Sequence, residues 1–204
     1  MKERAINMLK NIIFDMGNVL LDYDPEIPLN EFCTSEEEKD VIRRELFEGP
    51  EWVQGDMGTI RDADRYDLVK ERVPKEMHPA LKKCSYSWDI CLKPIEGARE
   101  FGRKVKAAGY GVYVLSNASD KFYEYFPKFL PFDFFDGILV SADVHMIKPD
   151  IRIYQHLLEK YQLQAEECLF IDDRPENVEG AKKAGMQAVV FENNYDKITE
   201  YIEK

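Results

Sequence analysis

Four short apolar runs divide this sequence, and they constrain its fold more than any other feature. They lie at residues 12–14, 111–115, 168–171 and 188–191, and a weaker fifth run lies at residues 137–140. Short continuous apolar runs bounded by turn residues are typical of parallel strands that are covered on both faces. The runs therefore predict a parallel β-sheet buried between two layers.

Helical patterns alternate with these runs from about residue 94 onward. An apolar stripe of helical period marks residues 94–108, with Pro94 at its start and Gly109 at its end. Further helices are predicted at residues 151–161, 177–184 and 194–204. Alternating strands and helices predict an α/β fold with a doubly wound, Rossmann-like parallel sheet.

Residues 25–92 have a different character. They contain no strong strand pattern, but charged helical patterns occur at residues 36–47, 60–71 and 79–88. We expect a small helical cap domain at residues 25–92, inserted after the first strand. The α/β core domain would then comprise residues 1–24 and 93–204.

The charge balance excludes some classes of partner. The chain has 39 acidic residues against 28 Lys and Arg, which gives a formal net charge of −11. Nucleic acids and anionic membranes require basic surface, so neither is the expected partner, whereas a small phosphorylated metabolite remains compatible. No apolar run approaches the roughly 20 residues of a membrane span, and residues 1–10 lack the apolar core of a secretory signal. We expect a cytoplasmic monomer or homodimer.

The four cysteines and three histidines do not have the spacing of metal ligands. No CxxC pair occurs among Cys33, Cys84, Cys91 and Cys168. We interpret the cysteines as reduced structural thiols, and no zinc site is expected.

Polar side chains follow the predicted strands at the points where the strands end. These residues are Asp15 after the first run, Ser116 and Asn117 after the second, Lys148 after the weak run, and Asp172 and Asp173 after residues 168–171. Each has an ordinary explanation as a polar strand end. Because the carboxyl ends of parallel strands share one edge of the sheet, we expect the set to meet there.

The two acidic strand ends suit phosphoryl transfer to a carboxylate. Asp15 is ionised near neutral pH and needs no base to act as a nucleophile. A divalent cation would let this anion attack a phosphate, and Asp15, Asp172 and Asp173 offer the hard oxygen ligands that Mg²⁺ prefers.

The remaining strand ends offer donors and positive charge for a phosphate group. The hydroxyl of Ser116, the backbone N–H of Asn117 and the backbone N–H groups at Met16 and Gly17 are candidate phosphate donors. Lys148 is the candidate positive charge beside the nucleophile and the phosphate.

Four sequence motifs carry a resemblance to a known family. They read FDMGNVLLD, VLSNAS, KPDIRIY and FIDDRPENVEGAKKAG, in this order along the chain. With them the chain resembles the haloacid dehalogenase-like (HAD) hydrolase superfamily. The wording FDMGNV with DDRPENVEGA is most similar to the α-D-glucose-1-phosphate phosphatase-like branch.

The resemblance implies a role for each matching residue. Asp15 would form an aspartyl phosphate, Lys148 would neutralise it, and Asn177 and Glu179 would brace the fourth motif. The implied Mg²⁺ ligands are Asp15, the carbonyl of Gly17, Asp172 and Asp173, and the implied phosphate ligands include Ser116 and Asn117.

Gly17 departs from the family pattern. Phosphatases of the family usually carry a second aspartate at this position, which protonates the leaving group. Its absence is compatible with another proton source such as Asp22, Asp24 or Asp56, or with a more acidic leaving group such as that of an anomeric phosphate. It is also compatible with a 2-haloacid dehalogenase or a non-catalytic HAD-fold binding protein.

The segment at residues 48–59 of the insert contains the candidate substrate residues. Trp52 could present an apolar face to a substrate and Asp56 a hydrogen-bonding acid; alternatively, Trp52 is cap core and Asp56 is a turn residue. The resulting hypothesis is a Mg²⁺-dependent phosphatase acting on a small phosphorylated metabolite such as a sugar phosphate. The alternatives remain the dehalogenase and the non-catalytic binding protein.

Overall fold

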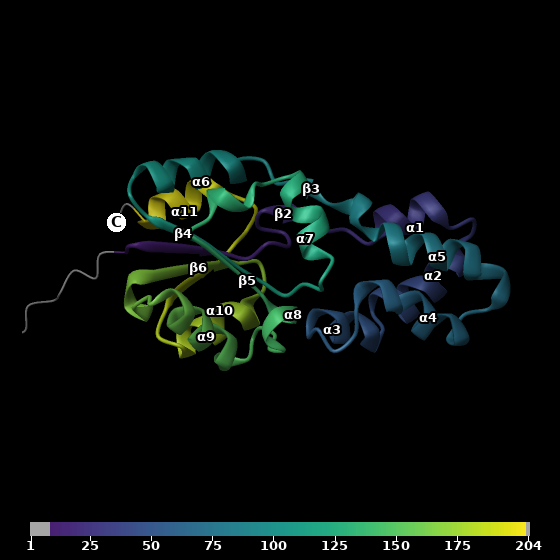
Figure 1. The fold of residues 1–204 in the computed structure, drawn as a ribbon. Helices are drawn as coiled ribbons and strands as arrows, with labels where there is room; N and C mark the ends of the chain where they lie inside the picture. Colours follow the sequence, from purple (N-terminus) through teal and green to yellow (C-terminus); the bar gives the residue numbers. More distant parts are fainter. Residues whose placement is uncertain (1–8, 203–204) are drawn as a thin grey trace, which may run out of the picture.

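A five-stranded, all-parallel sheet forms the centre of the computed structural model, which describes residues 9–202 (Figure 1). Residues 1–8, where no secretory signal is expected, and residues 203–204 of the last predicted helix lie outside this range. The strand order is β5 (Gly137–Val140), β4 (Gly111–Ser116), β1 (Asn11–Phe14), β6 (Cys168–Asp172) and β7 (Gln187–Val190). Each expected strand is present within one residue of its predicted bounds, so this part of the prediction is confirmed.

Both faces of the sheet are buried, which explains the continuous apolar runs. In β1, Ile12 and Phe14 belong to one hydrophobic cluster, and Ile13 belongs to the cluster on the opposite face. All three side chains are fully buried. Burying a side chain of this size contributes about 1.5–3 kcal/mol, so the central strand needs apolar residues at every position.

Helices cover the two faces, as a doubly wound sheet requires (Figure 1). Helices α6 (Ala98–Ala107) and α11 (Tyr195–Ile202) lie on one face, and α9 (Ile151–Tyr161) and α10 (Pro175–Lys183) lie on the other. Asp150 caps α9 by accepting a hydrogen bond from the backbone N–H of Arg152 at 3.0 Å. The predicted Rossmann-like α/β class is confirmed.

The first helix of the core begins later than the sequence indicated. The predicted start was Pro94, whereas α6 begins at Ala98. Pro94 instead pairs with Leu21 in a small antiparallel ladder between β2 (Leu21–Asp22) and β3 (Lys93–Pro94). Gly97 then adopts a left-handed conformation with φ of 80°, which a helix cannot contain.

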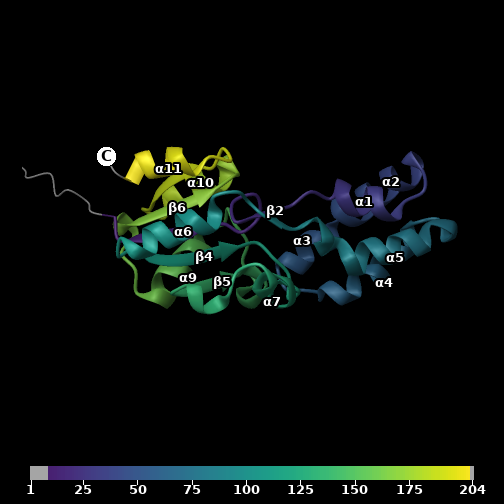
Figure 2. The same ribbon diagram turned by 90° about the horizontal axis from the view of Figure 1, so that it is seen from above.

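A separate helical lobe lies beyond the carboxyl ends of the strands (Figures 1 and 2). Its helices are α1 (Glu26–Phe32), α2 (Glu36–Ile42), α3 (Pro50–Asp56), α4 (Arg65–Val69) and α5 (His78–Ser87). Two helix predictions were too long: α2 changes to a π-helical turn at Arg43–Phe47, and α4 is flanked by 3₁₀ turns. Two short helices complete the core, α7 (Phe122–Tyr125) and α8 (Ser141–Val144).

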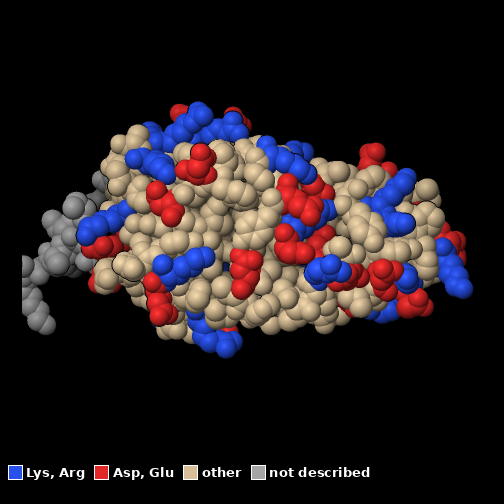
Figure 3. All heavy atoms as spheres, in the orientation of Figure 1, with Lys and Arg blue, Asp and Glu red and all other residues tan. Residues whose placement is uncertain are grey.

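Charged side chains of both signs occur on the face drawn in Figure 3, and the cysteines are unpaired thiols. Basic and acidic side chains are interspersed over the face drawn in Figure 3. All four cysteines are free, and three of them are buried. Among the described helices, none has the length and apolar composition that a membrane span requires.

Candidate active site

The polar strand ends converge at the carboxyl edge of the sheet. Asp15 follows β1, Ser116 ends β4, and Asp172 ends β6, while Lys148 reaches the same edge from the loop after α8. A cavity of about 520 Å³ opens there between the sheet and the helical lobe. Its walls therefore come from both parts of the chain.

Lys148 joins the two central carboxylates. Its Nζ lies 2.7 Å from Oδ1 of Asp15 and 2.7 Å from Oδ2 of Asp172. The side chains of Lys148 and Asp172 are fully buried. Water screens such an arrangement poorly, so the ammonium is strongly held between the two acids.

Burial shifts the proton affinities of this group. Burial and the neighbouring Asp172 raise the pKa of Asp15 to about 7, against the opposing effect of Lys148. For Lys148, burial lowers the pKa, but the two carboxylates outweigh burial and raise it above the usual value. The ammonium therefore stays charged.

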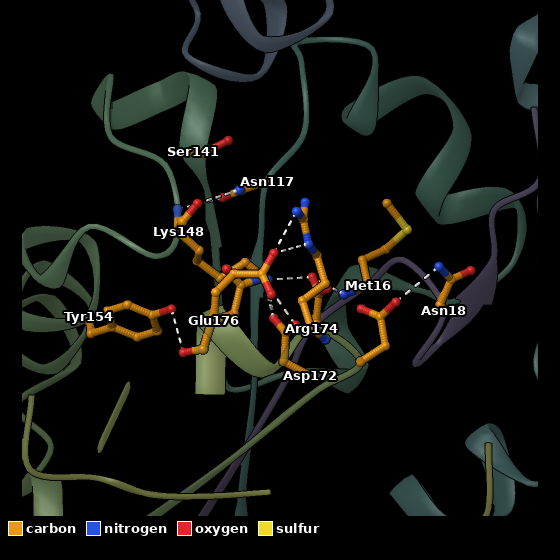
Figure 4. A network of polar contacts seen from close by, with 12 residues as sticks. Met16, Asn18, Asn117, Ser141, Lys148, Tyr154, Asp172, Arg174 and Glu176 are labelled. Atoms are coloured by element: carbon orange, nitrogen blue, oxygen red, sulfur yellow. Dashed lines mark hydrogen bonds and ion pairs between the residues drawn. The ribbon is translucent and has the colours of Figure 1, made fainter. Parts of the chain in front are cut away.

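A hydrogen-bond network orients Asp172 (Figure 4). Its Oδ1 accepts from the backbone N–H of Arg174 at 2.9 Å and from Nδ2 of Asn177 at 3.0 Å. Tyr154 in turn donates to the carbonyl of Asn177 at 2.8 Å. The expected bracing by Glu179 is wrong, because Glu179 pairs with Lys182 on the exposed side of α10.

Three carboxylates at this edge have the chemistry of a site for a hard divalent cation. One oxygen each from Asp15, Asp172 and Asp173 lies within 4.8 Å of the others. Within residues 9–202, Lys148 is the one cation in ion-pair contact with this group of acids, so the group favours an added cation. Asn18 donates to Oδ2 of Asp173 at 3.1 Å and holds that carboxylate beside the pair (Figure 4).

The expected phosphate donors differ in how they are engaged. The buried hydroxyl of Ser116 has no hydrogen-bond partner within residues 9–202. The side chain of Asn117 instead holds the Lys148 backbone, accepting from its N–H at 2.8 Å and donating to its carbonyl at 3.0 Å. The Met16 N–H donates to Oδ1 of Asp15 at 2.6 Å in this structure, and its contact with a phosphate group stays a prediction.

Aromatic side chains also line the cavity. Trp52 packs against Trp88 with ring centroids 5.3 Å apart, and the guanidinium of Arg65 lies 4.1 Å above the Trp52 ring. The other aromatic lining residues are Tyr23, Phe47 and Tyr125. Of these aromatic residues, only Trp52 was predicted as a substrate contact. The other four come from separate segments whose sequence patterns are those of ordinary core residues.

The three candidate proton sources differ in whether they line the cavity. Asp56 lines the cavity, whereas Asp22 and Asp24 are not among the described residues that do so. Asp24 accepts a hydrogen bond from the backbone N–H of Glu26 at 2.9 Å and so serves α1. Gly17 also lines the cavity, and a Cβ built there meets no atom within 4 Å.

Comparison with known proteins identifies the family. A family model described as haloacid dehalogenase-like hydrolase matches residues 9–185. The chain belongs to the haloacid dehalogenase-like hydrolase family, and it is therefore a hydrolase.

Individual relatives cover nearly the whole chain. Sesquiterpene phosphatase astK of Aspergillus oryzae is 30% identical over 185 residues, covering 87% of each chain. (S)-2-haloacid dehalogenase 4A of Burkholderia cepacia is 27% identical, covering 90% of this chain and 83% of that protein. A variant of HAD family enzyme bt-2542 of Bacteroides thetaiotaomicron, solved with magnesium and inorganic phosphate, has a TM-score of 0.74 at 22% identity. The structural match covers 93% of this chain and 98% of the bt-2542 chain, and it shows that the two proteins share a fold.

Proposed function

We propose that the protein is a Mg²⁺-dependent phosphatase that acts on a small phosphorylated metabolite through an aspartyl phosphate on Asp15. One observation carries the proposal: buried Lys148 is bound 2.7 Å from both Asp15 and Asp172, with Asp173 beside them. A buried nucleophile, a fixed positive charge and hard oxygen ligands together meet the needs of phosphoryl transfer.

The nucleophile is oriented by two donors on the same oxygen. Met16 N–H and Lys148 Nζ both bind Oδ1 of Asp15, so Oδ2 is the atom that attacks phosphorus. Lys148 disperses charge at the attacking carboxylate without entering the line of attack. The Ser116 hydroxyl and the backbone at Gly17 and Asn117 would bind the phosphate oxygens.

Asp15, Asp172, Asp173 and the carbonyl of Gly17 would hold Mg²⁺. When bound, the ion neutralises charge between the carboxylate and the phosphate, so that an anion can approach an anion. Asn18 and Asn177 keep Asp173 and Asp172 turned toward this position.

Residues 25–92 would act as a cap over the site, with residues 1–24 and 93–204 as the core. The cap contributes Trp52 and Asp56 to the cavity, and both would contact the organic part of the substrate. Closing such a lobe excludes water from the phosphate site and selects the substrate.

The cavity favours a substrate with an apolar face. Trp52, Trp88 and Tyr125 line the same cavity as the acidic edge of the sheet. Such rings stack on the apolar face of a sugar and also accommodate a terpenoid, and the relative in Aspergillus oryzae is named a sesquiterpene phosphatase. Sugar 1-phosphates and terpenyl monophosphates are therefore the two substrate groups to compare.

Dehalogenation of a 2-haloacid is the second candidate. Two observations favour it: Gly17 supplies no acid, and a haloacid dehalogenase is 27% identical over 90% of this chain. Against it, three clustered carboxylates favour a cation that halide displacement at carbon does not need.

One assay separates these functions. Phosphate release is measured from glucose 1-phosphate, farnesyl phosphate and p-nitrophenyl phosphate, and chloride release from 2-chloropropionate, each with Mg²⁺ or a chelator. We expect phosphate release that requires both Mg²⁺ and Asp15, with Asp15→Asn as the inactive control. Chelator-insensitive chloride release would establish the dehalogenase instead, and no turnover by the folded protein would indicate a binding function.

A further inference from the structure

Cleavage of an unactivated phosphate ester leaves an alkoxide, which needs a proton. This consideration rests on the proposed phosphatase function. Three of the described residues that line the cavity carry carboxyl groups: Asp15, Asp56 and Asp173. Asp15 is the proposed nucleophile, and Asp173 belongs to the carboxylate cluster and accepts from Asn18. Asp56 is the remaining carboxyl.

The other polar groups of the cavity are poor acids. Two carboxylates hold Lys148 and keep its proton in place. Burial raises the pKa of Tyr23 and of Tyr125 well above that of an ordinary phenol. The guanidinium of Arg65 is bound to Asp62 at 2.6 Å.

Contacts with the core fix the position of Asp56. Asp56 ends α3, and its carbonyl accepts a hydrogen bond from the hydroxyl of Ser141 at 2.5 Å. The next carbonyl, that of Met57, lies 2.9 Å from Nδ1 of His145. Gly58 follows with φ of 65°, and a Cβ there would lie 2.2 Å from the carbonyl oxygen of Ala142. The end of α3 is therefore docked on α8, at the core side of the cavity.

The surroundings of Asp56 leave its carboxyl available. Arg65 lies 3.9 Å away, beyond hydrogen-bonding distance, because its own Nη1 is bound to Asp62 at 2.6 Å. The side chain of Asp56 is one-fifth exposed, toward the cavity that it lines. Burial raises its pKa to about 7, although Arg65 acts in the opposite direction. A carboxyl that titrates near neutral pH exchanges protons efficiently at the pH of a cell.

We propose that Asp56 is the general acid and base of the reaction, supplied by the helical lobe. As Oδ2 of Asp15 forms its bond to phosphorus, the ester P–O bond breaks and the Asp56 proton passes to the departing alkoxide. The Asp56 carboxylate then accepts a proton from water as the water oxygen attacks phosphorus. The Asp15–phosphorus bond breaks, phosphate leaves, and Asp56 is protonated again.

The test is the dependence of the rate on the leaving group. kcat/KM is measured for p-nitrophenyl, phenyl and benzyl phosphate, whose leaving groups become progressively more basic, with the parent protein and with Asp56→Asn. Benzyl phosphate needs the proton most, so we expect its kcat/KM to fall by about 10²- to 10⁴-fold in the variant. p-Nitrophenolate leaves without a proton, and its kcat/KM should fall less than about tenfold.

A matched control is Asp67→Asn, on the same lobe but with a side chain that is 64% exposed and paired with Lys70. It should leave all three rates unchanged. The ratio of kcat/KM on p-nitrophenyl phosphate to kcat/KM on benzyl phosphate is measured on one preparation of each variant. A fraction of unfolded Asp56→Asn lowers both values equally and therefore cancels from the ratio. An unchanged ratio in Asp56→Asn would overturn the role of Asp56 while the phosphatase function stands; an inactive parent protein would overturn both.

Discussion

Nζ of Lys148 lies 2.7 Å from Oδ1 of Asp15, and neither side chain exposes more than 10% of its surface. The same ammonium is 2.7 Å from Asp172, so one positive charge serves two buried acids. The geometry predicts that Lys148 stabilises the site, in addition to the catalytic role proposed for it.

Removing this ammonium is expected to destabilise the protein. Lys148→Met leaves Asp15 and Asp172 buried without their partner, and losing one member of a buried ion pair costs about 3–5 kcal/mol. Burial raises the pKa of Asp15 to about 7, so Asp15 can accept a proton at low pH, and the loss should be larger at about pH 8 than at about pH 5. Urea unfolding at both pH values measures the difference.

Lys128→Met is the matched control for that experiment. Its ammonium is exposed and lies 3.5 Å from Asp89, so we expect a change below about 1 kcal/mol at either pH. Equal losses in the two variants would contradict the assigned importance of Lys148.

The hydroxyl of Ser116 is expected to matter for phosphate and not for folding. It is buried and makes no hydrogen bond within residues 9–202, so Ser116→Ala leaves no partner unsatisfied and should not lower the free energy of unfolding. The inhibition constant of inorganic phosphate should rise about 3- to 10-fold, which corresponds to one neutral hydrogen bond.

Ser85 supplies the comparison, because its hydroxyl is also buried with no hydrogen-bond partner among the described residues, but this α5 residue does not line the cavity. Ser85→Ala should leave phosphate inhibition unchanged. An unaltered inhibition constant in Ser116→Ala would show that the hydroxyl does not bind phosphate.

Gly58 is expected to control how α3 docks on the core. Gly58→Ala adds a Cβ 2.2 Å from the carbonyl oxygen of Ala142, so the end of α3 must move. Gly109→Ala carries a similar positive φ but meets no atom within 4 Å. Both should lose about 1–2 kcal/mol of stability from the left-handed conformation, and only Gly58→Ala should also lower kcat/KM on benzyl phosphate.

The charge state of Asp56 should appear in the pH dependence of stability. Its pKa rises from the usual 3.8 to about 7 on folding, through burial and Asp62, against Arg65 and Lys148. The folded state therefore binds more protons, and the stability contributed by Asp56 is lost as the pH rises from about 4 to about 7.

Asparagine does not titrate, so Asp56→Asn should gain stability relative to the parent at about pH 8, by up to about 4 kcal/mol. The gain should shrink toward about pH 4. Urea denaturation at several pH values measures it. If Asp56→Asn loses stability at about pH 8, or gains the same amount at every pH, the pKa of Asp56 is not raised by folding.

Patterns local in the sequence predicted the sheet and its acidic edge. The apolar runs are determined by burial on both faces, so they locate β1, β4 and β6 within one residue. Asp15, Lys148 and Asp172 meet because parallel strands place their carboxyl ends together.

Features that depend on tertiary contacts were not predictable. The sequence around Arg65 and Asp62 reads as an ordinary helical i, i+3 charge pair, and nothing in it indicates that Arg65 is 1% exposed and stacked on Trp52. The start of α6 depends on the pairing of Pro94 with Leu21, residues far apart in the chain. The docking of Gly58 on Ala142 is likewise a contact between two lobes.

Asp15, the proposed nucleophile, and Asp56, the proposed acid, belong to different lobes. Contacts of Ser141, His145 and Gly58 hold the two lobes together near the site. Under the proposed mechanism, opening the lobe to release an alcohol would first have to break the contacts that dock α3 on α8, and it would then carry Asp56 away from Asp15. Water can then enter without a base to activate it, and the phosphorylated aspartate persists until the lobe closes again. The lifetime of the phosphorylated enzyme would thus depend on how fast the lobe closes again. An acceptor alcohol that enters the open site would compete with water for the phosphoryl group.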